Sequence, residues 1–378
     1  MTPNVRDGKI LMVTEPSGGG SGRHFIDLSR ELTGRGYKVH AVYSPVRAED
    51  SFVAELGAAN LDGITAIPMR RSVGPNDAIS ALQLKKVIEK YGPFSVVHSH
   101  SSKAGAIARM VAPRAVARIY TPHAFRTMDP NIGRKGKIVY SAIERFLAVT
   151  STDAIIAVSA EERDHAVEIG IPEHKIHVVQ NGVDPSPTVN HDLIRSQLGI
   201  AADEIVVGFV GRMSTQKNPI KFVQAISKAA DIDRRVRGIM IGDGELLENV
   251  RRVADNRILL LGNQNARQFL PAFDIFMMTS NYEAMPYVLI EALHAGLPII
   301  SSKVGGTNST VLPGKNAACL PVSASPDDFA RVILSIVEDK LTTAYGHASL
   351  ALSEKFTVAG MTDETLAVYR AAKRELHG

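Results

Sequence analysis

Short runs of β-branched and other apolar residues alternate with helix-like segments along most of this chain, and this alternation restricts the possible folds more than any other feature. In the first half the runs begin at Lys9, Lys38, Ile64, Ser95, Ala117, Asp153 and Ile176. In the second half they begin at Glu204, Val236, Arg257, Phe273 and Pro298. Strands that alternate with helices form parallel sheets covered by helices on both faces. The sequence therefore predicts an α/β protein with doubly wound, Rossmann-like layers.

The length of the chain predicts two domains. At 378 residues it exceeds the size at which one hydrophobic core usually keeps growing. Residues 181–200 collect glycine, proline, serine and asparagine without a strand pattern, as an interdomain linker does. We place the N-terminal domain at residues 1–182 and the C-terminal domain at residues 183–356, and we expect a helix at about residues 357–378 to pack back on the first domain. The expected architecture is two Rossmann-like halves that face a central cleft.

Composition excludes several classes of protein. Hydrophobic residues make up 45% of the chain and charged residues 22%, which excludes a disordered or fibrous protein. The single cysteine, Cys319, excludes an internal disulfide framework and a cysteine metal cluster, and we expect it to be a small core residue. No apolar run has the length of a signal-peptide core or of a membrane span. A cytoplasmic protein is expected.

The segment GRMSTQKNP, residues 211–219, predicts an anion site. It follows an expected strand and leads into a helix, for which Asn218 is a plausible N-cap and Pro219 suits the first turn. Backbone amides at a helix N-terminus favour an anion, and Arg212 and Lys217 add two cations. A diphosphate is the ligand that this arrangement favours, and a solvated basic loop is the alternative.

Two glutamates, Glu283 and Glu291, begin and end the segment EAMPYVLIE. Glu283 precedes a helix that Pro286 is expected to open, and Glu291 lies within that helix among apolar neighbours. A carboxylate in such surroundings needs polar partners, and it can accept hydrogen bonds from the neighbouring hydroxyls of a ribose or a hexose. The alternative is a structural carboxylate that pairs with the backbone or with an arginine.

Glycines follow the first strand in SGGGSGRHF, residues 17–25. Gly19 and Gly20 can bring backbone amides close to a phosphate or to a sugar, and a tight strand-to-helix turn is the alternative. Arg23 stands where the third glycine of a dinucleotide fingerprint would pack, and no acid ends the second strand. The segment is therefore not an NAD site.

Histidines end two further strands, in HSHSSKAG at residues 98–105 and in YTPHAF at residues 120–125. Ligands of open α/β sheets bind at such strand ends. His98 and His100 have no cysteine or carboxylate cluster nearby, so we expect no metal there, and we expect His98 to be a satisfied histidine beneath the loop. Asp231 and Asp233 are not expected to bind a metal either, because ion pairs can satisfy them.

Basic residues are concentrated between Lys103 and Lys137, where the only acid is Asp129, and an apolar stripe follows. The net charge of the whole chain is only +4, so its location matters more than its size. The stripe consists of Ile138, Val139, Ala142, Ile143 and Phe146. An exposed stripe would bind an anionic membrane surface, but stripes of this kind usually face a core, and that is the arrangement we favour.

Taken together, the second-half segments resemble the retaining glycosyltransferases of family four, which have the GT-B fold of two Rossmann-like domains. The resemblance rests on GRMSTQKN, the IGDGEL turn, EAMPYVLIE, HAGLPII and KVGGT, in the family's order. It implies that Arg212 and Lys217 bind the diphosphate of a donor, that Glu283 contacts the transferred sugar, and that Glu291 contacts the ribose. The candidate catalytic residues are Arg212, Lys217, Glu283 and His123; the candidate donor-binding residues are Gly19, Gly20, Gly211, Gly242, Met285, Pro286, Tyr287, Val288 and Glu291; the candidates for an acceptor or sugar pocket are Glu15, Arg23, His100 and Lys103.

The chain also departs from the family pattern. Asn308, Ser309 and Thr310 follow the glycines where a glutamate is usual, and PGKNAACL at residues 313–320 has alanines where a second glycine is common. These changes leave the expected diphosphate site intact. They affect the loop expected to pack around the base or the sugar, so the family resemblance says less about which donor is bound.

The function that the resemblance implies is transfer of a sugar, with retention and without a metal or other cofactor, from a UDP- or GDP-sugar. The expected acceptor is a lipid-linked or growing glycan of a bacterial surface polysaccharide, held by the N-terminal domain at the inner face of the cell membrane; nucleic acid is not an expected partner. An inverting enzyme would need a carboxylate base, for which Glu15 is the best candidate. The alternatives from other classes are a nucleotide-sugar epimerase, a glycogen-phosphorylase-like enzyme and a noncatalytic protein that binds sugar nucleotides.

Overall fold

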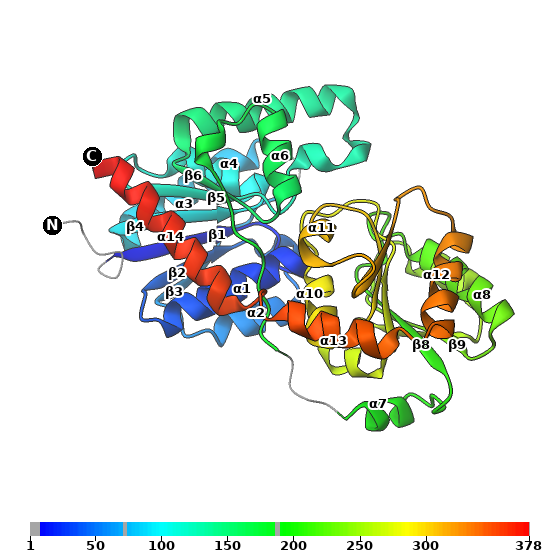
Figure 1. Ribbon diagram of the computed structural model, residues 1–378. Coiled ribbons are helices and arrows are strands. Elements are labelled where there is room, and N and C mark those ends of the chain that lie inside the picture. Colours follow the sequence, from blue (N-terminus) through cyan, green and yellow to red (C-terminus); the bar gives the residue numbers. More distant parts are fainter. Residues whose placement is uncertain (1–7, 71–73, 186–189, 378) are drawn as a thin grey trace. The chain divides into compact units, whose positions relative to one another are not determined.

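The computed structural model describes residues 8–70, 74–185 and 190–377, which form two compact units (Figure 1). The first unit consists of two segments, one that ends at Gly182 and one that begins at Thr357. The second unit runs from Val183 to Phe356. Both units alternate strands with helices, so the predicted α/β class is confirmed. Part of the expected linker, residues 186–189, lies outside the described residues.

The first unit is built on a parallel sheet with the strand order β3-β2-β1-β4-β5-β6-β7. Its strands are β1 (Lys9–Thr14), β2 (Val39–Tyr43), β3 (Gly63–Ala66), β4 (Phe94–His100), β5 (Ala117–Thr121), β6 (Ala154–Ala157) and β7 (Ile176–Val178). Its helices are α1 (Gly19–Gly34), α2 (Asp50–Gly57), α3 (Asn76–Tyr91), α4 (Ser102–Val111), α5 (Gly133–Ser151), α6 (Ala160–Glu168) and α14 (Val358–His377).

The second unit has a parallel sheet with the strand order β10-β9-β8-β11-β12-β13. Its strands are β8 (Ile205–Val210), β9 (Val236–Ile241), β10 (Ile258–Gly262), β11 (Ile275–Met278), β12 (Ile299–Ser302) and β13 (Ala317–Leu320). Its helices are α7 (His191–Gln197), α8 (Pro219–Ile232), α9 (Leu247–Val253), α10 (Tyr287–His294), α11 (Thr307–Thr310), α12 (Pro326–Glu338) and α13 (Thr342–Ser353).

The order of strands reverses at a corresponding place in each sheet. In the first unit β1 lies between β2 and β4, and in the second unit β8 lies between β9 and β11. Loops that leave neighbouring strands on either side of such a reversal diverge, and the space between them is where open α/β sheets bind their ligands. The loops after β1 and β4, and those after β8 and β11, are therefore the places to look for a site.

Strand β13 was not among the strands expected from the sequence. Residues Ala317–Leu320 pair in parallel with β12 and end the second sheet. The run is short and contains two alanines, so it carries little strand propensity of its own, and its place in the sheet comes from pairing. Cys319 lies on this edge strand and is only partly buried, so the prediction of a core cysteine was wrong.

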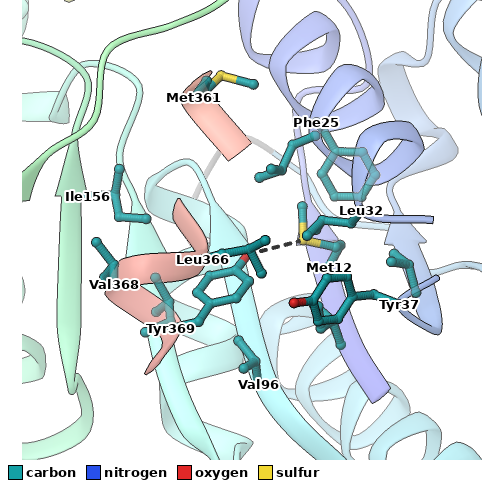
Figure 2. Close-up of a cluster of buried hydrophobic side chains, with 14 of the residues drawn as sticks. Met12, Phe25, Leu32, Tyr37, Val96, Ile156, Met361, Leu366, Val368 and Tyr369 are labelled. Atoms are coloured by element: carbon teal, nitrogen blue, oxygen red, sulfur yellow. Dashed lines mark hydrogen bonds between the residues drawn. The ribbon is translucent and has the colours of Figure 1, made fainter. Parts of the chain in front are cut away.

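The C-terminal helix α14 packs on α1 and β5 of the first unit. Figure 2 shows its residue Tyr369 beside Met12 of β1, with the hydroxyl 3.8 Å from the methionine sulfur. Tyr369, Met12 and Phe25 of α1 are fully buried, and burial of side chains of this size contributes about 1.5–3 kcal/mol each. The chain end thus completes the core of the unit in which the chain began.

Candidate functional site

The loop after β8 reaches its position through a close contact between two glycines. Gly211 has φ of 154° and Gly242, which follows β9, has φ of 136°. A Cβ atom on Gly242 would lie 2.0 Å from the carbonyl oxygen of Gly211. Both positions therefore need glycine, because any side chain would meet either the neighbouring backbone or a disfavoured conformation.

Arg212 and Lys217 lie on this loop before α8. Arg212 is exposed, whereas the side chain of Lys217 is largely covered. Helix α8 begins at Pro219 as predicted, but the side chain of Asn218 does not cap it. Asn218 has φ of 49°, and its amide donates instead to the side-chain oxygen of Asn281. The expected N-cap position was right and the expected capping bond was wrong, because the left-handed backbone turns that side chain away.

Lys217 and Glu283 meet although they are far apart in the sequence. The Lys217 ammonium donates to Oε1 of Glu283 at 2.6 Å, and the amide of Gln216 lies 3.4 Å from Oε2. Glu283 follows β11, which pairs with β8, so the two loops emerge from neighbouring strands. Glu283 is only 8% exposed. A lysine ammonium has three donors, so Lys217 can hold Glu283 and still donate to an anion.

Helix α10 carries Glu291 into a second ion pair. Pro286 occupies the N-cap position, as the sequence predicts, and Glu291 lies one turn into the helix. Its Oε1 accepts from Nε of Arg267 at 3.1 Å, and both side chains are mostly covered. The expectation that Glu291 has a polar partner is confirmed, and in this structure the partner is an arginine. No sequence signal marked Arg267, which lies in a short turn after β10.

The glycines of KVGGT pack against the segment that carries Glu283. A Cβ atom on Gly305 would lie 2.3 Å from the carbonyl oxygen of Glu283, and one on Gly306 would lie 2.5 Å from Cα of Met285. Met285, Pro286 and Tyr287 are buried, and Val288 is partly exposed. The backbone at Glu283 to Met285 therefore packs directly on the backbone of Gly305 and Gly306. This packing does not depend on the polar residues that follow Gly306.

In the glycine loop of the first unit, one backbone amide is already bonded to the carboxylate of Glu49. Gly19 begins α1 with φ of 58°, and its amide donates to a carboxylate oxygen of Glu49 at 3.3 Å. Gly20 is exposed. Arg23 pairs with Asp27 at 2.7 Å and with Glu55 at 3.2 Å. An anion that binds the Gly19 amide would compete with the Glu49 carboxylate, so this amide is less available than the sequence suggested.

The other pocket candidates of the first unit also have ionic partners. Glu15 is buried and pairs with Arg47, and Lys103 pairs with Asp77 at 2.5 Å. The Glu15 carboxylate already accepts a hydrogen bond from the Arg47 guanidinium, so a base role would compete with that ion pair. This arrangement does not favour Glu15 as the base of an inverting reaction.

Histidines from three elements form a buried cluster in the first unit. His98 bonds Tyr369 at 2.6 Å and Thr121 at 2.8 Å, which confirms that it is a satisfied histidine. His100 Nδ1 lies 3.1 Å from Nε2 of His123, and the two rings stack. His24 of α1, which the sequence analysis did not consider, lies edge-on to His123 with 4.6 Å between ring centroids.

Burial keeps this histidine cluster neutral. Burial lowers the pKa of His24 to about 4, although the hydrogen bond to Asn181 opposes the change. Burial, reinforced by the neighbouring imidazoles, also lowers the pKa of His98, His100 and His123 well below the usual value. The cluster therefore offers hydrogen bonds and lone pairs, and no positive charge, near neutral pH.

Neutral imidazoles are also the form in which histidine binds metals. One ring nitrogen each from His24, His100 and His123 lies within 4.8 Å of the others, so these residues have the spacing to hold a metal ion. His24 is far from these histidines in the sequence, and only the fold brings α1 to them. By contrast, Asp231 pairs with Arg257 and Asp233 with Arg235, so ion pairs satisfy these acids as predicted.

The apolar stripe on α5 is exposed, which contradicts the favoured prediction that it faces a core. Ile138 is 62% exposed and Phe146 is 65% exposed. The inner face of α5 is set instead by Glu144, which is buried against Arg109 at 2.7 Å and accepts from the hydroxyl of Tyr120. A buried carboxylate has to face its arginine, and this turns the apolar stripe outward.

Most of the basic residues around the stripe are either paired within the unit or exposed on α5. Arg109, Arg118 and Lys103 are held in ion pairs within the unit. The exposed basic residues of α5 are Arg134, Lys135, Lys137 and Arg145. Over the described residues, no helix combines the length and apolar character needed to cross a membrane.

Comparisons with known proteins identify the family of this chain. A family model described as Glycosyltransferase Family 4 matches residues 18–187, and one described as Glycosyl transferases group 1 matches residues 190–349. The UDP-Gal:alpha-D-GlcNAc-diphosphoundecaprenol alpha-1,3-galactosyltransferase of Escherichia coli is 30% identical over 281 residues, which cover 70% of this chain and 72% of that protein. The O-antigen biosynthesis glycosyltransferase WbnH of Escherichia coli is 28% identical, over 75% of this chain and 78% of that protein.

A solved structure shows the same fold. Anabaena Alr3699/HepE in complex with UDP-glucose superposes with a TM-score of 0.80 at 22% sequence identity, covering 95% of this chain and 99% of that one. At this identity the likeness establishes the fold and leaves the substrate open.

Proposed function

The chain belongs to glycosyltransferase family 4, and from this premise we propose that it transfers a hexose from a UDP-sugar to a lipid-linked glycan of a bacterial surface polysaccharide. It is a glycosyltransferase with the GT-B fold, as predicted. The proposal for donor and acceptor is supported by the galactosyltransferase relative, whose name gives UDP-Gal and a GlcNAc-diphosphoundecaprenol, and by HepE, whose structure holds UDP-glucose. A GDP-sugar is the other donor to test.

The contact between Lys217 and Glu283 carries the proposal. It joins a basic loop to the acid that precedes α10, within a single unit. In our proposal Arg212, Lys217 and the amides near Met285 bind the donor diphosphate, while Glu283 accepts a hydrogen bond from the transferred sugar. Glu291 would bind the ribose with the oxygen that Arg267 leaves available. From the first unit, His123 would offer its neutral imidazole to a sugar hydroxyl.

The proposed reaction needs charge stabilisation more than a protein nucleophile. The bond between the sugar C1 and the phosphate oxygen breaks, and a bond forms between C1 and the acceptor oxygen on the same face. The acceptor proton passes to the departing phosphate oxygen. Fixed positive charge from Arg212 and Lys217 stabilises the developing charge on the diphosphate. We therefore propose that no metal is needed and that configuration is retained.

A donor panel tests this function most directly. Binding of the right nucleotide sugar raises the melting temperature in proportion to its saturation, so UDP- and GDP-sugars can be compared by thermal shift. The anomeric configuration of the product, read by NMR, then tests retention. No stabilisation by any sugar nucleotide would contradict the proposed site, and an inverted product would contradict the proposed stereochemistry.

The alternative functions make different predictions. An epimerase would convert its donor without an acceptor, and a noncatalytic protein would bind the donor without transfer. The family assignment does not favour either. Donor turnover assayed with and without a lipid-linked acceptor separates all three.

We also propose that α5 binds the surface of an anionic membrane. Its exposed apolar residues can insert among lipids, while Arg134, Lys135 and Lys137 attract acidic headgroups. This would place the enzyme at the inner face of the cell membrane, beside a lipid-linked acceptor. Each basic residue near the surface contributes about 1 kcal/mol, so the attraction should weaken as salt rises.

Sedimentation with vesicles tests the membrane contact. The protein should sediment with vesicles that contain an acidic phospholipid and much less with purely zwitterionic vesicles. Ile138→Ser combined with Phe146→Ser should reduce binding, whereas Leu82→Ser, at an exposed apolar position on α3, should not. Equal binding by all three proteins would rule out α5 as the contact.

A further inference from the structure

The turn that carries His123 has an unusual backbone. His123 has φ of 53° and Ala124 has φ of 76°, so two successive residues with side chains adopt the left-handed conformation. Such a conformation is costly for residues other than glycine and persists only where the surroundings enforce it. The turn therefore needs a partner that holds it in place.

Glu162 of α6 supplies that partner. Its Oε1 accepts from the backbone amide of Ala124 at 2.6 Å, and its Oε2 accepts from the amide of Val158 at 2.8 Å. The side chain is fully buried. Ser159 caps α6 by accepting from the amide of Glu162, which fixes the start of the helix that carries the carboxylate.

The surroundings of Glu162 are unusual for a purely structural acid. Within the described ranges its carboxylate has no cationic partner, and both of its recorded bonds are to backbone amides. Burial raises its pKa to about 7, although the two amides oppose the change. A buried acid of this kind is costly to the fold, and the two hydrogen bonds from backbone amides offset part of that cost.

On its other side, His123 is held only through contacts of its side chain. The imidazole contacts His100 and His24, and both of these rings are buried. Ring contacts constrain the position of the side chain, but they leave the peptide between His123 and Ala124 to be fixed by Glu162. A change of that peptide would rotate the imidazole, because Cβ of His123 is attached to the same backbone.

We propose that Glu162 is a positioning residue, which holds the left-handed turn at His123 and Ala124 and so fixes the imidazole that faces the transferred sugar. This inference rests on the proposed function, which assigns His123 to the sugar. Glu162 itself is buried and touches no substrate. Its effect on the reaction passes through the backbone of the turn.

Glu162→Gln tests the proposal, because the change replaces one of the two acceptor oxygens by an NH2 group, which cannot accept from a backbone amide. We expect kcat/KM to fall at least tenfold while the affinity for UDP, measured by calorimetry, stays unchanged. Glu168→Gln, at an exposed position on the same helix, should match the wild type. Loss of UDP affinity in Glu162→Gln would instead indicate a general defect and would overturn the proposal.

Two combinations separate positioning from stability. Ala124→Gly should restore most of the activity of Glu162→Gln, since glycine adopts the left-handed turn without help. In addition, Glu162→Gln should cost little in a His123→Ala background, because both changes remove the same contact. Absence of rescue together with additive losses would overturn the proposal. If Glu162→Gln alone does not fold, its combination with Ala124→Gly is compared with Ala124→Gly alone.

Amide hydrogen exchange distinguishes failure of this inference from failure of the proposed function. The amide of Ala124 should exchange slowly in the wild type and in His123→Ala, and much faster in Glu162→Gln. If exchange behaves in this way but His123→Ala retains full activity, Glu162 does hold the turn at Ala124 and the proposed role of His123 in transfer is wrong. If exchange at Ala124 is unaffected by Glu162→Gln, the proposal that Glu162 holds the turn is wrong.

Discussion

The Lys217 ammonium lies 2.6 Å from a carboxylate oxygen of Glu283, across the loops that leave two neighbouring strands. Each residue therefore determines how much of the other's charge is available to a ligand. A diphosphate that binds Lys217 would meet an ammonium already oriented by Glu283. This coupling predicts different effects for changes at the two positions.

Lys217→Ala should weaken UDP binding roughly 10- to 100-fold, because a charge-assisted hydrogen bond contributes about 1.5–3 kcal/mol. Glu283→Gln should bind UDP within a few-fold of wild type and lose transfer activity instead. Calorimetry with UDP and steady-state kinetics measure the two effects. Lys228→Ala, at an exposed lysine of α8, is the control. Unchanged affinity in Lys217→Ala would refute the diphosphate assignment.

Glu291 should contribute selectivity for the ribose. Wild type should bind UDP more tightly than 2′-deoxy-UDP, and Glu291→Gln should lose most of this difference. Arg267→Ala should also weaken UDP binding, because Glu291 would lose the partner that orients it. Affinities from calorimetry test both expectations, with Glu338→Gln on α12 as control. If Glu291→Gln keeps the full preference for the ribose, the carboxylate is only structural.

Gly242→Ala should destabilise the second unit by about 3 kcal/mol or more, because it combines a backbone clash with a disfavoured φ. Gly262→Ala is a matched control, since Gly262 has φ of 69° but open space around it. It should cost only about 1 kcal/mol. Urea unfolding measures both variants. Similar losses in the two would mean that the contact between Gly242 and Gly211 contributes little.

Transfer should continue in the presence of a chelator, and added Zn²⁺ should inhibit it. Zinc prefers neutral imidazole ligands, and binding to His24, His100 and His123 would withdraw His123 from the sugar. His24→Asn should raise the zinc concentration needed for half inhibition, whereas His191→Asn, at an exposed site, should not. Loss of activity in chelator that Mg²⁺ or Mn²⁺ restores would contradict the metal-free mechanism.

The stability of the first unit should fall as the solution is acidified. His24 has a pKa of about 4 in the folded state against about 6.5 when unfolded, so between these values the unfolded chain binds the additional proton. Its contribution is fully present above pH 6.5 and is lost as the pH falls to about 4, by up to about 3 kcal/mol. Glu162 acts in the opposite sense over part of this range, because its pKa is raised. The comparison is therefore between wild type and His24→Asn.

Urea unfolding at a series of pH values measures this difference. The free energy of unfolding of wild type should fall more steeply below pH 6.5 than that of His24→Asn. The exposed control His191→Asn should follow the wild type. Parallel pH profiles for wild type and His24→Asn would mean that His24 is not buried as a neutral ring.

The sequence by itself determined the fold class, most strands and the loop that carries Arg212 and Lys217 into α8, because these depend on local patterns. Neighbouring residues are enough to predict the alternation of strands and helices. They also mark the turn glycines Gly211 and Gly242 and the position of Pro286 at the start of α10. The family resemblance added roles that spacing alone leaves open. Strand β13 escaped because a short alanine-containing run becomes a strand only through the neighbour it pairs with.

Only the tertiary structure decided which polar groups meet. Arg267 reaches Glu291, His24 reaches His123, and Glu162 reaches Ala124, and each pair joins segments whose separation in the sequence gives no sign of contact. The outward stripe of α5 has the same origin, since a buried ion pair with another helix set its orientation. Periodicity shows that a helix has an apolar face, but the direction of that face depends on which partner the remaining residues must bury against.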